Sequence, residues 1–235
     1  MVNTSIPLYG IMILLSLLLN ALIIIFTYNK KIFSKSEIFG AIIYENIGII
    51  VGAKTLAYIE NYSLYNGVFD FWKLGLSSYG GIFGGLIFLI LFALQFKKKI
   101  SNMIYTFVLP IPLMYSIGKI GCFLAGCCYG IPYNGFGHIV YKYAVNSEIN
   151  NISFFPVQLV ESIVFFLIFL YACFKHKDYS LKNLDILIIL CGFAKFLLDF
   201  LRASHMGIIL STAQYISLGF IITGLILIIM KGKKN

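Results

Sequence analysis

Charged residues are scarce in this sequence. Asp, Glu, Lys and Arg make up 11% of its 235 residues, whereas hydrophobic residues make up 60% and the mean hydropathy is +0.92. Soluble globular domains carry about 25% charged residues, so this balance excludes that class. It predicts a polytopic membrane protein.

Several other features are absent as well. No basic region precedes the first apolar run and no small-residue cleavage pattern follows it, so we expect that run to stay as a helix rather than to be removed as a signal peptide. No low-complexity linker interrupts the chain, which favours a single transmembrane domain over residues 1–235. No nucleic-acid-binding motif is present. We attribute the net charge of +9 mainly to basic residues that set the membrane topology and attract anionic lipid headgroups.

Seven apolar runs are long enough to cross a bilayer, which takes about 18–25 residues. They lie near residues 8–28, 38–59, 77–96, 103–121, 156–174, 184–201 and 212–230. Lysines follow the first, third, fifth and seventh runs, and the positive-inside rule places those ends in the cytoplasm. The sequence therefore predicts an all-α fold with about seven transmembrane helices, an external N-terminus, a cytoplasmic C-terminus and a small external head at about 122–155, between helices 4 and 5.

Seven ionisable side chains fall at membrane depth, where each is costly unless it meets a partner or a water-filled cavity. They are Glu45, Lys54, Lys119, Glu161, Lys195, Asp199 and Arg202. The last three are spaced i, i+4 and i+7, which places them on one helical face. Four cations stand against three anions, and surplus positive charge in a membrane cavity favours an anionic ligand such as a lipid phosphate. Alternatively, these charges only pair with one another or reach to the interface.

Two glycine-rich stretches stand at helix ends predicted to be external. SSYGGIFGG spans residues 77–85, and GKIGCFLAGCCYG spans residues 118–130. Small residues at intervals of four let helices approach closely, so packing is the leading interpretation for Gly80, Gly81, Gly84 and Gly85. Backbone amides near a helix start could instead bind a phosphate.

Seven segments, in chain order, resemble motifs of the prolipoprotein diacylglyceryl transferase family. They are YG at 9–10, GAK at 52–54, SSYGG at 77–81, GKIGCFLAGCCYG at 118–130, FPVQLVE at 155–161, KFLLDFLR at 195–202 and TAQYISLG at 212–219. Together they extend over nearly the whole chain. The resemblance implies transfer of a diacylglyceryl group from phosphatidylglycerol to the thiol of the lipobox cysteine of a lipoprotein precursor, with release of glycerol phosphate.

The resemblance also implies a set of site residues in a multi-pass protein of the bacterial plasma membrane, with no metal and no cofactor. Tyr79, Lys119 and Arg202 take the catalytic positions, and Lys119 and Arg202 would hold the departing phosphate. The expected substrate-binding residues are Tyr9, Lys54, Gly80, Gly81, Cys122, Cys127, Gln158, Glu161, Lys195 and Asp199.

Some positions depart from the family pattern. Lys119 stands where the family has arginine, and Tyr79 stands where it has the histidine proposed as a base. Because the reference pKa of tyrosine is about 10, Tyr79 is a poorer base at neutral pH. His205, three residues after Arg202, could substitute.

Cysteines replace two further polar family residues, at Cys122 and Cys127, and Cys128 follows directly. A disulfide from Cys122 to Cys127 or Cys128, a lining of the substrate site, and a nucleophile at Cys127 that first accepts the lipid are the three interpretations. Zinc is disfavoured because no histidine falls at a ligand spacing and C-x-x-x-x-C-C is not a standard site.

Two other functions stay open from the sequence. A non-catalytic relative could keep the lipid cavity to bind phospholipid or a small cysteine-containing peptide. A thiol oxidoreductase is disfavoured because Cys127 and Cys128 are adjacent and lack the C-x-x-C spacing.

Overall fold

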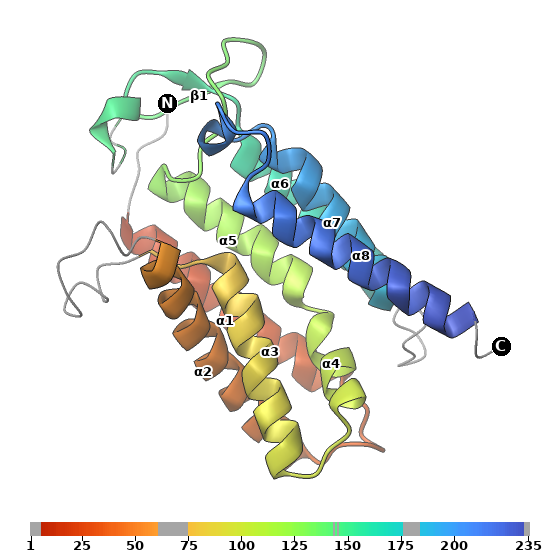
Figure 1. Ribbon diagram of the computed structural model, residues 1–235. Coiled ribbons are helices and arrows are strands. Elements are labelled where there is room, and N and C mark those ends of the chain that lie inside the picture. Colours follow the sequence, from red (N-terminus) through yellow and green to blue (C-terminus); the bar gives the residue numbers. More distant parts are fainter. Residues whose placement is uncertain (1–5, 61–74, 143, 145, 176–183, 233–235) are drawn as a thin grey trace. The chain divides into compact units, whose positions relative to one another are not determined.

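The computed structural model describes residues 6–60, 75–142, 144, 146–175 and 184–232. These residues form eight α-helices, a pair of short strands and two 3-10 turns (Figure 1). The helices are α1 (Ile6–Thr27), α2 (Lys35–Glu60), α3 (Ser78–Gln95), α4 (Ile100–Val108), α5 (Ile111–Ala125), α6 (Val157–Lys175), α7 (Leu184–Asp199) and α8 (Thr212–Gly232). The strands are β1 (Ile139–Val140) and β2 (Ser153–Phe154), and the turns are η3 (Ser147–Ile149) and η6 (Ala203–His205).

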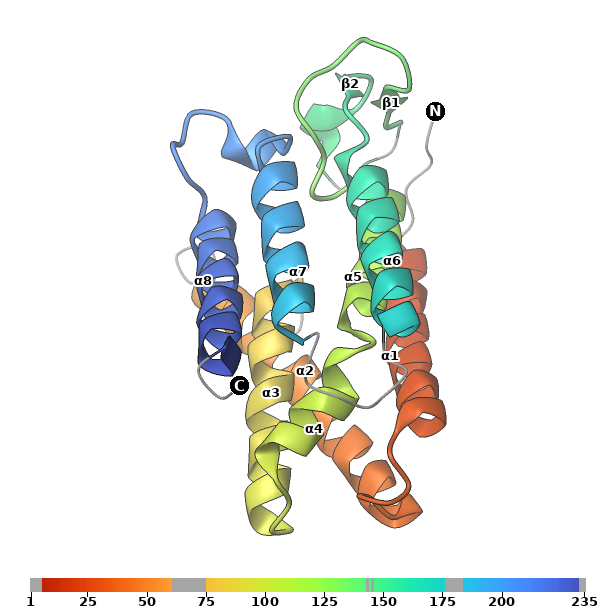
Figure 2. The same ribbon diagram turned by 90° about the vertical axis from the view of Figure 1, so that its right-hand side faces the viewer.

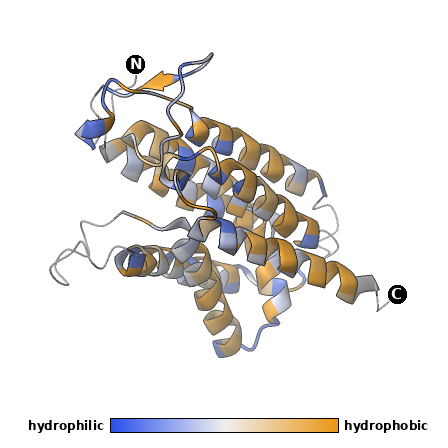
Figure 3. Cartoon of the chain, turned by 45° about the horizontal axis from the view of Figure 1, so that its top comes forward, coloured by the Kyte–Doolittle hydropathy of each residue, from blue (hydrophilic) through white to orange (hydrophobic). Residues whose placement is uncertain are grey.

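The helices confirm an all-α, multi-pass membrane protein. Five of them, α1, α2, α3, α6 and α8, are long and apolar enough to cross a bilayer. A sixth span results if α4 and α5 count together. Hydrophobic residues predominate on the helices taken together, as a lipid-facing surface requires (Figure 3). The number seven and the orientation of the termini stay predictions.

The predicted fourth span at 103–121 is not one continuous helix, which corrects the sequence analysis. α4 ends at Val108 and α5 begins at Ile111, with Pro110 at the N-cap and Pro112 in the first turn. Proline lacks a backbone N–H and its ring clashes with the preceding turn, so a helix ends before it and a new one can begin with it. The motif LPIP at 109–112 thus divides the span.

The chain divides into two compact units. Unit 1 consists of Met1–Asn20 and Leu109–Asn235, and unit 2 of Ala21–Val108. The expectation of a single transmembrane domain stays a prediction.

In unit 2, α2 and α3 pack with their backbones in contact. A Cβ atom added at Gly48 would lie 2.5 Å from the carbonyl oxygen of Gly84, and one added at Gly84 would collide with the carbonyl oxygen of Gly48. Gly52 and Gly80 face each other in the same way. The packing interpretation of Gly80 and Gly84 is therefore confirmed.

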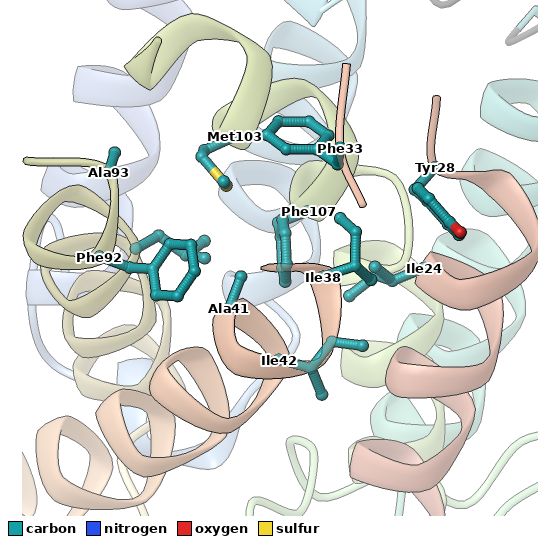
Figure 4. Close-up of a cluster of buried hydrophobic side chains, with 11 residues drawn as sticks. Ile24, Tyr28, Phe33, Ile38, Ala41, Ile42, Phe92, Ala93, Met103 and Phe107 are labelled. Atoms are coloured by element: carbon teal, nitrogen blue, oxygen red, sulfur yellow. The ribbon is translucent and has the colours of Figure 1, made fainter. Parts of the chain in front are cut away.

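Beside the glycines, large side chains fill the core of unit 2. Ile24, Ile38, Phe92, Met103 and Phe107 are almost completely buried and belong to one hydrophobic cluster (Figure 4). They come from α1, α2, α3 and α4, so this cluster joins the helices of the unit.

The start of α2 carries a capping box. The backbone N–H of Glu37 donates to Ser34 Oγ at 3.3 Å, and the backbone N–H of Ser34 donates to Glu37 Oε2 at 3.0 Å. These bonds satisfy N–H groups that have no partner inside the helix. Glu37 also forms a surface ion pair with Lys98, at 2.6 Å.

In unit 1, α6 packs against α5 and α7, and α7 packs against α8 (Figure 2). Between α5 and α6 lies the predicted head, built from turns, the antiparallel pair β1–β2 and η3. Its small core consists of Tyr141, Ile149 and Phe154, all buried. The backbone of Gly130 bridges to that of Arg202, which ties the head to the end of α7.

Candidate functional site

Unit 1 contains a buried group of five charged side chains, which we call the ionic cluster. Its members are Lys119 on α5, Glu161 on α6, Lys195 and Asp199 on α7, and Arg202 just after α7. Sequence analysis selected all five, and the structure brings all five together. The cluster contains three cations and two carboxylates.

Glu161 joins three helices of the unit. Its Oε2 lies 2.6 Å from Lys119 Nζ and its Oε1 lies 2.8 Å from Lys195 Nζ. The hydroxyl of Tyr115 donates to Oε1 at 3.1 Å. The Glu161 side chain has no exposed surface, and this carboxylate fixes both ammonium groups in a region of low dielectric constant.

Asp199 holds the other end of the cluster. Its Oδ1 lies 3.0 Å from Lys195 Nζ and 3.4 Å from Arg202 Nη1, and its Oδ2 accepts a hydrogen bond from Ser211 Oγ. The i, i+4 prediction for Lys195 and Asp199 is thus confirmed. The i+7 placement of Arg202 on the same helical face is wrong, because α7 ends at Asp199 and Arg202 has an extended backbone, although its side chain still reaches Asp199. Ser211 and Tyr115 were not selected from the sequence, because single hydroxyl groups carry no spacing signal.

Arg202 is the most accessible cation of the ionic cluster. Its side chain is 19% exposed, whereas those of Lys119 and Lys195 are 8% and 7% exposed. The Nε atom of Arg202 is buried and has no hydrogen-bond partner among the described residues. A buried N–H donor without a partner is costly, so this guanidinium is suited to accept an anionic ligand.

His205 lies next to the ionic cluster. Its ring is buried, and its Nδ1 atom lies 3.9 Å from Asp199 Oδ2. The ring packs edge-on against the ring of Phe200, with 4.7 Å between the two ring centroids. The suggestion that His205 handles a proton stays a prediction.

Three cysteines form a second group, the thiol loop, defined as Cys122, Cys127 and Cys128. Their sulfur atoms all lie within 4.8 Å of one another, and all three are free thiols. The structure has no disulfide among them, and the disulfide considered from the sequence for the oxidised protein stays a prediction. Gly126 and Cys128 have φ values of 69° and 56°, and these two left-handed residues fold the chain back over the end of α5.

Gln158 connects the thiol loop to the head. Its Nε2 donates to the carbonyl oxygen of Cys127 and to the hydroxyl of Tyr141, both at 2.9 Å. Burial raises the pKa of the Tyr141 phenol, which keeps it neutral. Gln158 and Glu161 are both completely buried on α6. Of this i, i+3 pair, Gln158 contacts the thiol loop and Glu161 belongs to the ionic cluster.

Tyr9 on α1 belongs to the same unit. A Cβ atom added at Gly121 would lie 3.2 Å from its ring, so Tyr9 packs against α5 next to Cys122. Tyr79, Lys54, Gly80 and Gly81 lie on α2 and α3 in unit 2. Their catalytic or substrate-binding roles stay predictions.

Comparisons with known proteins agree with the sequence motifs. The family model described as prolipoprotein diacylglyceryl transferase matches residues 1–230. A phosphatidylglycerol–prolipoprotein diacylglyceryl transferase of Clostridium tetani is 31% identical over 92% of this chain and 90% of its own length. A second such protein, transferase 2 of Clostridium perfringens, is 28% identical over 97% and 93% of the two chains. This chain belongs to the prolipoprotein diacylglyceryl transferase family.

Proposed function

We propose that this protein is an enzyme of the bacterial plasma membrane that transfers a diacylglyceryl group from phosphatidylglycerol to the lipobox cysteine of a lipoprotein precursor. Family membership supports the reaction class, and the names of the relatives support both substrates. The acceptor sulfur forms a bond to the glycerol carbon of the lipid while the bond from that carbon to the phosphate oxygen breaks. Glycerol phosphate leaves with the electron pair, and the proton of the acceptor thiol ends on it.

The ionic cluster is the observation that carries this proposal. The departing phosphate gains negative charge as the bond breaks, and fixed cations in a region of low dielectric constant stabilise that charge strongly. Arg202 offers the buried Nε donor without a partner, and its planar guanidinium can hold two phosphate oxygens. Lys119 and Lys195 add further positive charge to the cluster, and Glu161 holds both of their ammonium groups in place.

The test replaces Arg202. In the Arg202→Ala protein, transfer of labelled diacylglyceryl from phosphatidylglycerol vesicles to a lipobox peptide is expected to fall about 100-fold, as for other residues that stabilise transition-state charge. Arg202→Lys is expected to recover part of the rate, because lysine keeps the positive charge but lacks the planar guanidinium that can bind two phosphate oxygens. Lys142→Ala, at an exposed basic residue of the head, is the matched control and is expected to transfer at the wild-type rate.

Two results would contradict the proposal. If Arg202→Ala is folded and transfers at the wild-type rate, the phosphate does not bind at the ionic cluster. If the wild-type protein is stabilised by phosphatidylglycerol but modifies no peptide, the protein is a phospholipid-binding relative without transferase activity. The replacement of the family histidine by Tyr79 is the feature that favours this second function.

A further inference from the structure

We propose that Cys122, Cys127 and Cys128 bind one zinc ion and leave a coordination position for the thiol of the acceptor peptide. The thiol loop alone supplies the three ligands of this metal site. The role of the open position rests on the proposed transferase function.

The distances between the three sulfur atoms suit a common ion. Zinc binds thiolates at about 2.3 Å, so three sulfurs around one zinc stand about 4 Å apart. The sulfurs of the thiol loop already lie within 4.8 Å of one another. No separation therefore exceeds the sulfur spacing around a zinc ion by more than about 1 Å.

The loop that presents the thiols is held in place from several sides. The backbone N–H of Cys127 donates to the carbonyl oxygen of Cys122 at 3.1 Å, and Gln158 holds the carbonyl oxygen of Cys127 at 2.9 Å. Cys128 has a φ of 56°, a conformation that costs a residue with a side chain about 1–2 kcal/mol. Strained residues of this kind persist where the surroundings fix them, and they concentrate at functional sites.

The donor set selects the ion. Three thiolates and no oxygen ligand suit zinc and copper(I), whereas magnesium and calcium require oxygen ligands. Zinc reduces the charge of three thiolates from −3 to −1. The ionic cluster of the same unit has three cations and two carboxylates, so it carries one surplus positive charge that can balance the remaining negative charge.

Three ligands leave one position of a tetrahedral zinc ion open. Among the described residues, the group of side chains that could hold a metal ion consists of these three cysteines, without a fourth ligand. Zinc sites with three protein ligands and an open position are the catalytic type, while structural sites have four. A thiol that coordinates zinc is deprotonated, so the acceptor cysteine would enter the reaction as the thiolate that the new carbon–sulfur bond requires.

The metal site is tested by measuring bound zinc in the full-length protein in detergent, purified under reducing conditions. We expect one zinc per wild-type chain and loss of that zinc in Cys122→Ser, Cys127→Ser and Cys128→Ser. Cys173→Ser and Cys191→Ser are the matched controls, because these free thiols lie on α6 and α7 outside the thiol loop, and both are expected to retain the zinc. Absence of zinc from the wild type, its retention in all three loop variants, or a disulfide within the loop on nonreducing mass analysis would overturn the site.

The open position is tested with cobalt(II) in place of zinc. A lipobox peptide is expected to intensify the sulfur-to-cobalt absorption, whereas the same peptide with serine for its cysteine is expected to leave it unchanged. An identical response to both peptides, or equal transfer rates with and without bound metal, would overturn the role of the ion and leave the proposed transferase function intact. If zinc binds and the cysteine peptide alone changes the cobalt spectrum but no lipid is transferred, the metal site holds and the proposed function fails.

Discussion

Glu161→Leu is expected to destabilise the folded protein by about 3–5 kcal/mol, the cost of leaving a buried charge without its partner. Glu161 contacts Lys119 Nζ at 2.6 Å and Lys195 Nζ at 2.8 Å from a completely buried position. Without this carboxylate, two ammonium groups stay close together in a region of low dielectric constant and repel each other. Thermal or denaturant unfolding in detergent, with and without phosphatidylglycerol, measures the effect.

A double variant separates the charge effect from packing. Lys119→Met combined with Glu161→Leu removes an ion pair together and fills its space with apolar atoms, which is often nearly neutral in a protein interior. The double variant is therefore expected to be more stable than Glu161→Leu alone. If it is less stable, lost packing rather than unpaired charge explains the effect.

The chain also provides a surface pair for comparison. Lys98 Nζ lies 2.6 Å from Glu37 Oε1, the same distance as in the Lys119–Glu161 pair, but these side chains are 24% and 30% exposed. Exposed pairs contribute about 0–1 kcal/mol. Lys98→Met is therefore expected to change stability by no more than that amount. A loss as large as that of Glu161→Leu would show that burial is not what makes the cluster important.

The sequence predicted helices well where the chain has a single strong signal. The run expected at 77–96 is α3 at Ser78–Gln95, and the run expected at 156–174 is α6 at Val157–Lys175, because long apolar segments must satisfy their backbone groups as helices. The fourth run was misread because hydropathy alone ignores Pro110 and Pro112. The chemistry of proline in LPIP could have located that break.

The ionic cluster was predictable in its members but not in its pairing. The spacing of Lys195 and Asp199 follows from the period of one helix, whereas Arg202 lies just beyond the end of α7. That both lysines bind Glu161 depends on how α5, α6 and α7 pack, and that arrangement is not encoded in a local pattern. Likewise, the C-x-x-x-x-C-C spacing does not reveal that left-handed turns at Gly126 and Cys128 bring three sulfurs together.

Gly84→Leu is expected to prevent unit 2 from reaching its folded arrangement. A Cβ atom at Gly84 would collide with the carbonyl oxygen of Gly48 and would lie 2.8 Å from Gly52 Cα. Both neighbours are backbone atoms, which cannot rotate away as a side chain can. Added side-chain atoms in a tight core typically cost about 1–3 kcal/mol, and we expect Gly84→Ala to reach the upper end of that range and Gly84→Leu to exceed it.

Gly219→Leu is the control that distinguishes this packing effect from a general effect of replacing glycine in a membrane helix. Gly219 lies on α8, is exposed, and has no atom within 4 Å of an added Cβ. Leucine favours the helix by up to about 1 kcal/mol over glycine, so this variant is expected to be as stable as the wild type or slightly more stable. Gly84→Leu and Gly219→Leu are compared by measuring the yield of folded protein and the unfolding temperature of each in detergent. If Gly84→Leu unfolds at the same temperature as Gly219→Leu, α2 and α3 do not pack through their glycine backbones.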